Sequence, residues 1–333
     1  MSSKVAPLTI KDVAKAAGVS TATVSRVINH SGYVSNEVRL HVQKMIERLN
    51  YQPNVLARSL KMEKTKTIGM VLPDMTNAYL MTAARIVQKR LMEEGYHLIY
   101  MDSGEDPVKE REAIQLLLGM RIEALVLAGT GENGDLVNQI MQAGTTTILM
   151  DRTIQGVNSS MVLEDNVSAS EEAASRIIVE FGAQFGIICG PTGISTARER
   201  YEGVVRALET AGLAHEFEQR MIYEGDFTRG SGSLACSYFM NMTIPPRAVI
   251  SFNNEMTYGF YLRLKELGAG LDSIKVVSFG ELDAAPLFSN RLAVIRPNPQ
   301  LIGEAVAELV LKRVKDGNHE KEKRILMPRF ESF

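Results

Sequence analysis

The stretch GVSTATVSRVI, residues 18–28, decides how this chain of 333 residues begins. Its apolar residues, among them Val24 and Val27, fall on one face of a helix, and the residues between them are mostly small or hydroxylated. The same apolar spacing recurs over residues 10–17 and 38–49. The sequence therefore predicts three short helices that pack around a small shared core.

Capping and turn residues separate these helices. Thr9, Ser20 and Ser35 stand where N-caps are expected, because each precedes a helical pattern and carries an oxygen that can accept a backbone N–H. Gly18 lies between the first two helices as a turn residue. A helix, a glycine-containing turn and a second helix form a helix-turn-helix, whose second helix enters the major groove of DNA.

The outward face of the second helix suits this role. Small and hydroxylated side chains let a backbone approach the floor of the groove, and Arg26 can pair with guanine O6 and N7. Ala22 can contact a thymine methyl group. The predicted DNA-contacting residues of this helix and its end are Thr21, Ala22, Thr23, Ser25, Arg26 and Asn29. A three-helix bundle without a DNA-binding role is the alternative.

The distribution of charge supports DNA binding by one end of the chain. Residues 1–66 hold eleven Lys or Arg against four Asp or Glu, whereas the remainder holds 26 basic and 35 acidic residues. The formal net charge of −2 therefore hides a basic N-terminal region on an acidic body. Concentrated basic charge is what phosphate binding requires, although an ordinary solvated surface is an alternative.

From residue 67 onward, short apolar runs alternate with amphipathic stretches. The runs are typical of buried parallel strands, and the amphipathic stretches predict helices. The pattern predicts an α/β fold of parallel sheets flanked by helices, long enough for two lobes. The predicted strands are TIGMVLP, HLIYMD, ALVLAG, TTILMD, SMVLED, FGIICG, RMIYEG, AVISFN, IKVVSFG and LAVIRP, and the predicted helices include 77–94, 167–182, 196–213 and 299–316.

These segments resemble the lactose-repressor/galactose-repressor family of bacterial transcription regulators over essentially the whole chain. The resemblance is carried by TIKDVAKAAGVSTATVSRVIN, VSNEVRLHVQKMIERLNYQPNVLARSLK and TIGMVLPD, then DN at 165–166, RERYEG at 198–203, NNEMTYG at 253–259 and IKVVSFG at 274–280. It implies a sequence-specific DNA-binding repressor that binds a pseudo-palindromic operator as a homodimer. It also implies a two-lobed body, like a periplasmic binding protein, in which a small metabolite controls operator affinity allosterically.

The expected domains follow from this organisation. A helix-turn-helix head is expected at 1–52, a hinge helix and linker at 53–66, and an effector-binding and dimerisation body at 67–333. The N-lobe of the body is expected at about 67–162 and 292–320, and its C-lobe at about 163–291 and 321–333.

The hinge segment carries further expected DNA contacts. The resemblance implies that residues 54–61 form a helix on DNA and insert Leu60 into the minor groove. The side chains suit this role, because an apolar wedge can unstack a base step. The other expected contacts in this segment are Asn54, Ala57 and Arg58. A short amphipathic helix that packs on the body is the alternative.

Loops at the carboxyl ends of the predicted strands should hold the effector, because ligands bind there in open parallel sheets. Their many polar groups suit a sugar or sugar derivative, with Tyr79 as a stacking surface. The predicted effector-binding residues are Asp74, Asn77, Tyr79, Asp151, Arg198, Arg200, Asn253 and Glu281. For three of these, Asp151, Arg200 and Asn253, the resemblance itself implies contact with the effector.

Two departures from the family pattern bear on the ligand. Relatives usually carry an aspartate at each of two positions. This chain has Glu281, directly after a glycine, at one of them and Asn254 at the other. With fewer carboxylates nearby, Arg198 and Arg200 would be freer to face an anion. The sequence therefore favours an effector with a phosphate or carboxylate group, such as an anionic sugar derivative.

A glycine pattern in the body imitates a dinucleotide-binding fingerprint. Gly129, Gly131 and Gly134 follow a predicted strand with G-x-G-x-x-G spacing, and Asp151 ends the next strand. The third glycine of that fingerprint belongs inside the first helical turn, whereas residues 133–135 read as a loop that ends in an N-cap. The five histidines also lie away from predicted strand ends, so an NAD-dependent oxidoreductase is disfavoured. A sugar-binding carrier protein, the other alternative, would need a signal peptide and no basic head.

Composition sets the remaining expectations. The sequence has no run of about 18 apolar residues and no secretory signal, so we expect a cytoplasmic, nucleoid-associated protein without a membrane partner. Cys189 and Cys236 are too few for a disulfide framework or a metal site, and both should be reduced. We expect no metal, no cofactor and no enzymatic activity. Because no leucine-rich helix follows LMPRFESF, we expect a dimer rather than a tetramer.

Overall fold

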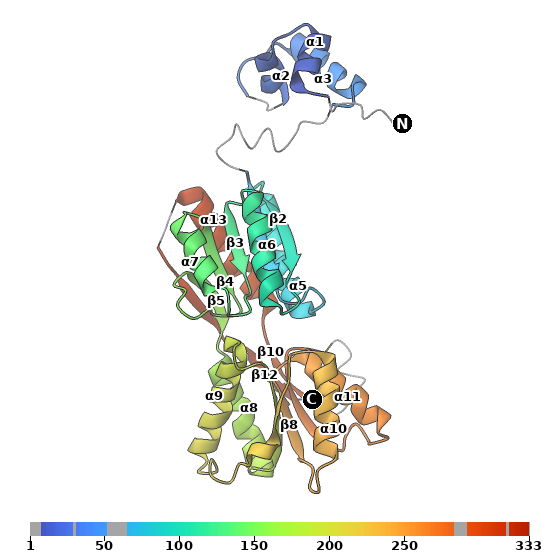
Figure 1. Ribbon diagram of the computed structural model, residues 1–333, viewed down its shortest axis with the longest axis vertical. Helices are drawn as coiled ribbons and strands as arrows, with labels where there is room; N and C mark the ends of the chain where they lie inside the picture. Colours follow the sequence, from blue (N-terminus) through green and yellow to red (C-terminus); the bar gives the residue numbers. More distant parts are fainter. Residues whose placement is uncertain (1–7, 29–30, 52–64, 283–291, 318–319, 333) are drawn as a thin grey trace. The chain divides into compact units, whose positions relative to one another are not determined.

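The protein, seen here as a computed structural model, is described for residues 8–28, 31–51, 65–282, 292–317 and 320–332. The chain divides into two compact units, Met1–Thr65 and Lys66–Phe333 (Figure 1). Each unit has its own hydrophobic core, so each is considered by itself.

The first unit is a bundle of α1 (Ile10–Ala17), α2 (Thr21–Ile28) and α3 (Asn36–Arg48). Its core residues include the fully buried Val13, Val24 and Val42, so the predicted inward face of α2 is confirmed.

All three predicted N-caps of the first unit are confirmed. The Asp12 carboxylate accepts hydrogen bonds from both the backbone N–H and the hydroxyl of Thr9, at 2.8 and 2.7 Å. Ser20 Oγ accepts from the Thr23 N–H at 3.1 Å, and Ser35 Oγ accepts from the N–H of Val38 at 3.4 Å. The turn before α2 contains Gly18, whose φ of 63° lies in the left-handed region that favours glycine.

Within the described residues, the N-lobe of the second unit is a parallel six-stranded sheet with the order β11-β5-β4-β3-β1-β2. Its strands are β1 (Thr67–Leu72), β2 (His97–Asp102), β3 (Ala124–Leu127), β4 (Thr146–Met150), β5 (Ser160–Glu164) and β11 (Lys323–Leu326). One face packs on α5 (Ala78–Glu93) and α13 (Pro299–Asp316), and the other on α6 (Pro107–Gly119) and α7 (Gly134–Gln142). Both faces are therefore buried, as expected for parallel strands.

The C-lobe holds the second sheet, with the order β12-β10-β9-β8-β6-β7 among the described residues. Its strands are β6 (Phe185–Cys189), β7 (Ile222–Glu224), β8 (Ala248–Ser251), β9 (Lys275–Phe279), β10 (Leu292–Arg296) and β12 (Arg329–Ser332), with a 3₁₀ turn at Gln219–Met221. All pairs are parallel except β10 with β12. The helices of this lobe are α8 (Asn166–Phe181), α9 (Ser195–Thr210), α10 (Arg229–Met240) and α11 (Asn254–Glu266) (Figure 1).

Two glycines bring the starts of α10 and α11 together. A Cβ atom on Gly259 would lie 1.8 Å from the carbonyl oxygen of Arg229, and one on Gly232 would lie 2.0 Å from that of Met256. Any side chain at these positions would force the helices apart. The close approach places Arg229 and Asn254, the first residues of the two helices, near each other.

The ten predicted strands and the four predicted helices are confirmed to within about three residues. The predicted division into lobes is wrong at its C-terminal end. We placed β10 in the N-lobe, yet it pairs with β9 of the C-lobe, and we placed β11 in the C-lobe, yet it pairs with β5 of the N-lobe. The apolar β10 fits between two strands, whereas β11 alternates exposed and half-buried residues and forms a sheet edge.

Candidate functional site

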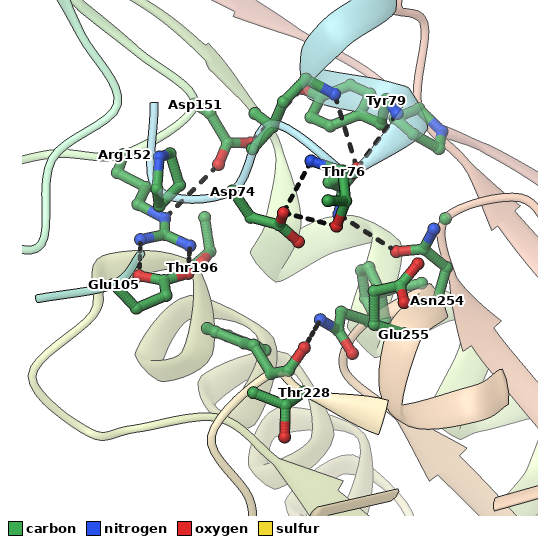
Figure 2. Close-up of a pocket in the computed structure, with 18 of the residues that line it drawn as sticks. Asp74, Thr76, Tyr79, Glu105, Asp151, Arg152, Thr196, Thr228, Asn254 and Glu255 are labelled. Atoms are coloured by element: carbon green, nitrogen blue, oxygen red, sulfur yellow. Dashed lines mark hydrogen bonds and ion pairs between the residues drawn. The ribbon is translucent and has the colours of Figure 1, made fainter. Parts of the chain in front are cut away.

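A cavity of about 590 Å³ lies between the two lobes, where the loops after the strands of both sheets meet (Figure 2). Its size lies within the range of small-molecule sites, and its place at the carboxyl ends of parallel strands is the usual one. Seven carboxylate side chains and three arginines line it: Asp74, Asp102, Glu105, Asp151, Glu164, Asp226, Glu255, Arg152, Arg200 and Arg229. Tyr79, Phe227 and Phe279 add aromatic surface.

The loop after β1 presents polar groups to the cavity from a fixed turn. Asp74 Oδ1 accepts hydrogen bonds from the N–H and the hydroxyl of Thr76, at 2.7 and 2.6 Å (Figure 2). Asn77 Oδ1 caps α5 by accepting from the Tyr79 N–H at 3.0 Å. These contacts fix the loop through Asp74 Oδ1 and Asn77 Oδ1 and leave Asp74 Oδ2 outside them.

A buried ion cluster follows β4. Arg152 Nη1 and Nη2 each donate to a carboxylate oxygen of Glu105, both at 2.7 Å, and Arg152 Nε lies 3.7 Å from Asp151 Oδ2 (Figure 2). Asp151 also accepts from the Tyr79 hydroxyl at 3.3 Å. Burial raises the pKa of the Asp151 carboxyl, although Arg152 and Arg200 act in the opposite direction. The charge of Arg152 is therefore already compensated within the protein.

Arg200 projects from α9 and is held from three sides. Its Nε donates to Asn166 Oδ1 at 2.9 Å, its Nη1 donates to the Phe252 carbonyl, and its guanidinium lies 4.4 Å from the ring centroid of Phe279. Such stacking on an aromatic face favours a cation. Unlike the other two arginines of the lining, Arg200 forms no ion pair within 4 Å with a carboxylate of the described residues.

Glu164, the last residue of β5, is buried at the inner wall of the cavity, with 6% of its surface exposed. Its Oε1 accepts a hydrogen bond from the Asn298 N–H at 3.3 Å. Burial, with a smaller contribution from the nearby Asp151 charge, raises the pKa of Glu164 to about 8, although Arg200 and the Asn298 N–H act to lower it. At neutral pH this carboxyl group therefore carries a proton.

The C-lobe wall is organised around Asn253 and Arg229. The Asn253 amide donates to the Phe227 carbonyl at 2.8 Å and its Oδ1 accepts from the Met256 N–H at 2.8 Å, so this side chain caps α11 and fixes the preceding loop. Arg229 Nε donates to Glu255 at 2.5 Å. A second arginine of the cavity is thus paired internally.

Among the described residues, two hydrogen bonds join the lobes. Asn77 Nδ2 donates to Asn254 Oδ1 at 3.4 Å (Figure 2), and the Thr153 N–H donates to Ser195 Oγ at 2.9 Å. These contacts would break if the lobes moved apart, so the structure represents an arrangement in which the lobes meet across the cavity.

The structure brings six of the eight predicted effector residues to the cavity: Asp74, Asn77, Tyr79, Asp151, Arg200 and Asn253. Arg198 and Glu281 do not line it, so their prediction is wrong in this respect. Arg198 Nη1 donates to the carbonyls of Thr192 and Gly193, and Glu281 forms an ion pair with Arg296 at 3.2 Å. Both positions follow strands or begin helices, and sequence alone does not show to which side such a side chain turns.

Sequence reasoning did not select several lining residues, among them Glu105, Glu164, Phe227, Arg229, Glu255 and Phe279. Glu164 and Phe279 end strands β5 and β9, so the rule that ligands lie beyond strand ends could have found them. Glu105 lies in a turn, with a φ of 58°, and no sequence motif marks that turn as part of a site.

The outward surface of α2 holds five of the predicted DNA-contacting residues. Thr21, Ala22 and Arg26 are exposed, and Thr23 and Ser25 are half-buried. The Arg26 side chain extends beside Gly32, because a Cβ atom at that glycine would lie 3.4 Å from Arg26 Cδ. The contacts predicted for Asn29, Asn54, Ala57, Arg58 and Leu60, with the hinge helix at 54–61, lie outside the described residues.

The glycine-rich loop after β3 differs from its prediction. Gly134 is the first residue of α7 and Asn133 is the N-cap, so residues 133–135 are not a loop that ends in a cap. Instead, the buried Glu110 carboxylate occupies the loop. It accepts from the Thr130 N–H at 2.6 Å, the Thr130 hydroxyl at 3.1 Å and the Asn133 amide at 2.8 Å. A carboxylate of the protein thus takes the donors that a dinucleotide phosphate would need.

The cysteines, possible metal sites and possible membrane-spanning helices of the described residues bear on other classes of function. Cys189 and Cys236 are free and buried. Among the described residues, no group of three or more His, Cys, Asp or Glu side chains is arranged to hold a metal ion. None of the described helices is both long enough and apolar enough to cross a membrane.

Comparison with known families assigns both units. Residues 9–54 match the family described as "Bacterial regulatory proteins, lacI family". Residues 65–331 match "Periplasmic binding proteins and sugar binding domain of LacI family". The matches cover the three-helix head and nearly all of the two-lobed unit.

Similar proteins agree with this assignment. The chain is 31% identical over 318 residues to the HTH-type transcriptional repressor PurR of Photobacterium profundum, with 94% of each chain covered. In fold it is similar to the Lac repressor bound to ONPG, with a TM-score of 0.80 at 21% identity and 98% and 99% of the two chains covered. It is also similar to the Cra regulator of Pseudomonas putida in complex with fructose 1-phosphate, with a TM-score of 0.72 at 21% identity over 80% of this chain and 98% of that one. The chain is therefore a DNA-binding transcriptional regulator with a small-molecule effector domain, and it belongs to the lacI family of bacterial regulatory proteins.

Proposed function

We propose that this regulator represses transcription as a homodimer and that a neutral sugar in the cavity sets its affinity for operator DNA. The single observation that carries the choice of effector is the internal pairing of two of the three arginines in the lining, Arg152 and Arg229.

The lining favours a neutral ligand over the anionic sugar derivative that the sequence alone favoured. With Glu164 uncharged, six carboxylates against three arginines still make the wall of the cavity acidic overall, so a phosphate would meet repulsion. Carboxylate oxygens are good acceptors for sugar hydroxyl groups, and Tyr79, one of the aromatic residues of the lining, is the proposed stacking surface for a sugar ring. The family description of residues 65–331 as a sugar-binding domain supports the same class.

Within this site, the proposed roles of the residues follow from their atoms. Asp74 and Asp151 accept from ligand hydroxyls, and Arg200 donates to a ligand oxygen from its stacked position on Phe279. Asn253 acts mainly by holding its loop, because its amide is already used on both sides.

A thermal-unfolding screen tests the effector class. The purified protein is heated with neutral sugars, sugar phosphates, sugar acids and nucleobases, since a ligand at 100 times its Kd stabilises a protein by about 2.7 kcal/mol. We expect a shift with a neutral sugar and none with its phosphate. A shift confined to anionic ligands would overturn the neutral class and leave the regulator assignment intact.

Matched variants locate the binding site. Arg200→Lys keeps the charge but loses the planar guanidinium, so it should remove most of the ligand-induced shift. Arg206→Lys on the same helix, where Arg206 is exposed and paired with Glu202, serves as the control and should keep the full shift. Loss of the shift in both variants would place the ligand elsewhere.

For DNA binding, we propose that Thr21, Ala22 and Arg26 contact base edges and that Thr23 and Ser25 contact the backbone or bases. Affinity for a selected operator should fall steeply with salt, because Lys and Arg displace counterions from phosphates. Operator binding that does not change with salt would contradict this role. We further propose that the protein acts on the cytoplasmic nucleoid and has no enzymatic activity.

A further inference from the structure

Three segments carry the chain between the two lobes, and they meet at one place. The first runs from β5 to α8, the second from β10 to α13, and the third from β11 to β12. Any change in the angle between the lobes must bend all three, so a residue buried where these segments touch can influence that angle.

Glu164 stands at this meeting point. It ends β5, in the first segment, and its carboxyl Oε1 accepts from the Asn298 N–H of the second segment at 3.3 Å. Its neighbour Asp165 donates its N–H to the Leu326 carbonyl of the third segment at 2.8 Å. Pro297 and Pro328, from the second and third segments, line the same cavity as Glu164.

The surroundings of Glu164 disfavour a charge on it. Only 6% of its surface is exposed. The ionisable groups of the described residues that interact with it are Asp151 after β4, Arg200 on α9 and Tyr79 on α5. Arg200 is already shared with Asp151, which leaves no cation dedicated to Glu164.

We propose that Glu164 is a positioning residue whose uncharged carboxyl group, buried where the first and second crossover segments touch, favours the arrangement in which the lobes meet. Ionisation of the group favours an arrangement in which the lobes separate and the carboxylate reaches water. The angle between the lobes is therefore linked to proton binding, whatever the identity of the effector.

The direction of the linkage follows from burial. In the closed arrangement the pKa of Glu164 is raised to about 8, mainly by burial. Separation of the lobes would hydrate the carboxyl group and return its pKa toward its ordinary value. Protons therefore favour the closed arrangement, and raising the pH from the ordinary carboxyl range up to about 8 increasingly favours the open one.

Distance measurements between spin labels test this without any ligand. One label is placed on α7 of the N-lobe through Gln139→Cys and one on α8 of the C-lobe through Val179→Cys, both exposed positions. Cys189→Ala and Cys236→Ala remove the native thiols. Labelled full-length chain is diluted with excess unlabelled chain, so that labels on a partner copy do not contribute. The distance distribution is then recorded from about pH 5 to about pH 9, which covers the window below the raised pKa and a range above it.

We expect the distribution to shift progressively as the pH rises from the ordinary carboxyl range toward about 8, to become constant above it, and to stay fixed in Glu164→Gln, which retains the acceptor oxygen without the charge. Glu224→Gln, at the exposed end of β7, is the matched control and should retain the shift. A wild-type distribution that does not change with pH, or a change that persists in Glu164→Gln, would overturn the proposal.

A second variant covers the possibility that Glu164→Gln does not fold. Asp151→Asn removes the neighbouring negative charge and so lowers the pKa of Glu164 in the closed arrangement, so the distance change should level off at a lower pH and be smaller in total. A distance change that levels off at the same pH as in the wild type would contradict a role for Glu164. The outcome is independent of the ligand screen, because no sugar is present in the labelling experiment.

Discussion

Asn77 of the N-lobe donates a hydrogen bond from its Nδ2 to Asn254 Oδ1 of the C-lobe at 3.4 Å, beside the effector cavity. The two side chains begin helices α5 and α11, so the bond joins a fixed point of one lobe to a fixed point of the other. A contact of this kind exists only when the lobes meet.

Removal of this contact should loosen the closed arrangement. Asn254→Ala deletes the acceptor but leaves the cap of α5, which depends on Asn77. We expect the free energy of unfolding of the second unit to fall by about 1 kcal/mol, the usual worth of one hydrogen bond. Chemical denaturation measures this, with Asn241→Ala at the exposed end of α10 as the control. An equal loss in both variants would show that the bond between the lobes contributes nothing of its own.

Recognition by α2 should depend on the shape of Arg26 as well as its charge. Arg26→Lys keeps the positive charge but loses the planar fork that pairs with two acceptors of guanine. We expect operator affinity to fall by about 1–3 kcal/mol while affinity for unrelated DNA stays nearly constant. Fluorescence anisotropy with an operator selected from random sequences checks this. A parallel loss on both DNAs would assign Arg26 to phosphate contact only.

The stability of the second unit should depend on pH through Glu164. Its pKa is raised to about 8 in the folded protein, so its contribution is fully present below the ordinary carboxyl pKa and is lost as pH rises through about 8. Unfolding free energies should fall by up to about 1.4 kcal/mol per pH unit across this window from this group alone. Glu164→Gln should flatten that slope, and denaturant titrations at several pH values measure it. A slope equal to that of the wild type would exclude Glu164 as its source.

The buried carboxylate of Glu110 should be needed for stability. Glu110→Ala would leave the Thr130 N–H, the Thr130 hydroxyl and the Asn133 amide without their acceptor in a buried loop. We expect a loss of about 3 kcal/mol or more, because each orphaned donor costs about 1–3 kcal/mol. Glu112→Ala on the same helix is the control, and guanidinium unfolding compares the two. A loss of less than about 1 kcal/mol would mean that water replaces the carboxylate.

Most of the fold was predictable because its signals are local. Apolar runs mark the ten predicted strands, and the caps at Thr9, Ser20 and Ser35 mark where helices begin. The strands β11 and β12 were missed because edge strands carry alternating or polar residues, and their short length gives no clear period. Their pairing depends on partners more than a hundred residues away in the case of β11 and β5.

The location of the site was predictable from the sequence, but the direction in which each side chain points was not. The strand-end rule brought Asp74, Tyr79 and Asp151 to one cavity, because parallel strands share one carboxyl edge. It could not show that Arg198 turns away to bind the carbonyls of Thr192 and Gly193. It also could not show that Arg152 is neutralised by Glu105, which changes the inferred charge of the ligand.

The exchange of strands near the end of the chain has a consequence for how the protein can be dissected. Because β10 and β12 belong to one sheet while α13 and β11 belong to the other lobe, neither lobe is a continuous piece of sequence. No single proteolytic cut yields two self-sufficient halves. A truncation after Asp316 would remove an edge strand from each of the two sheets. The loss of one terminal segment would therefore destabilise both lobes, on both sides of the cavity.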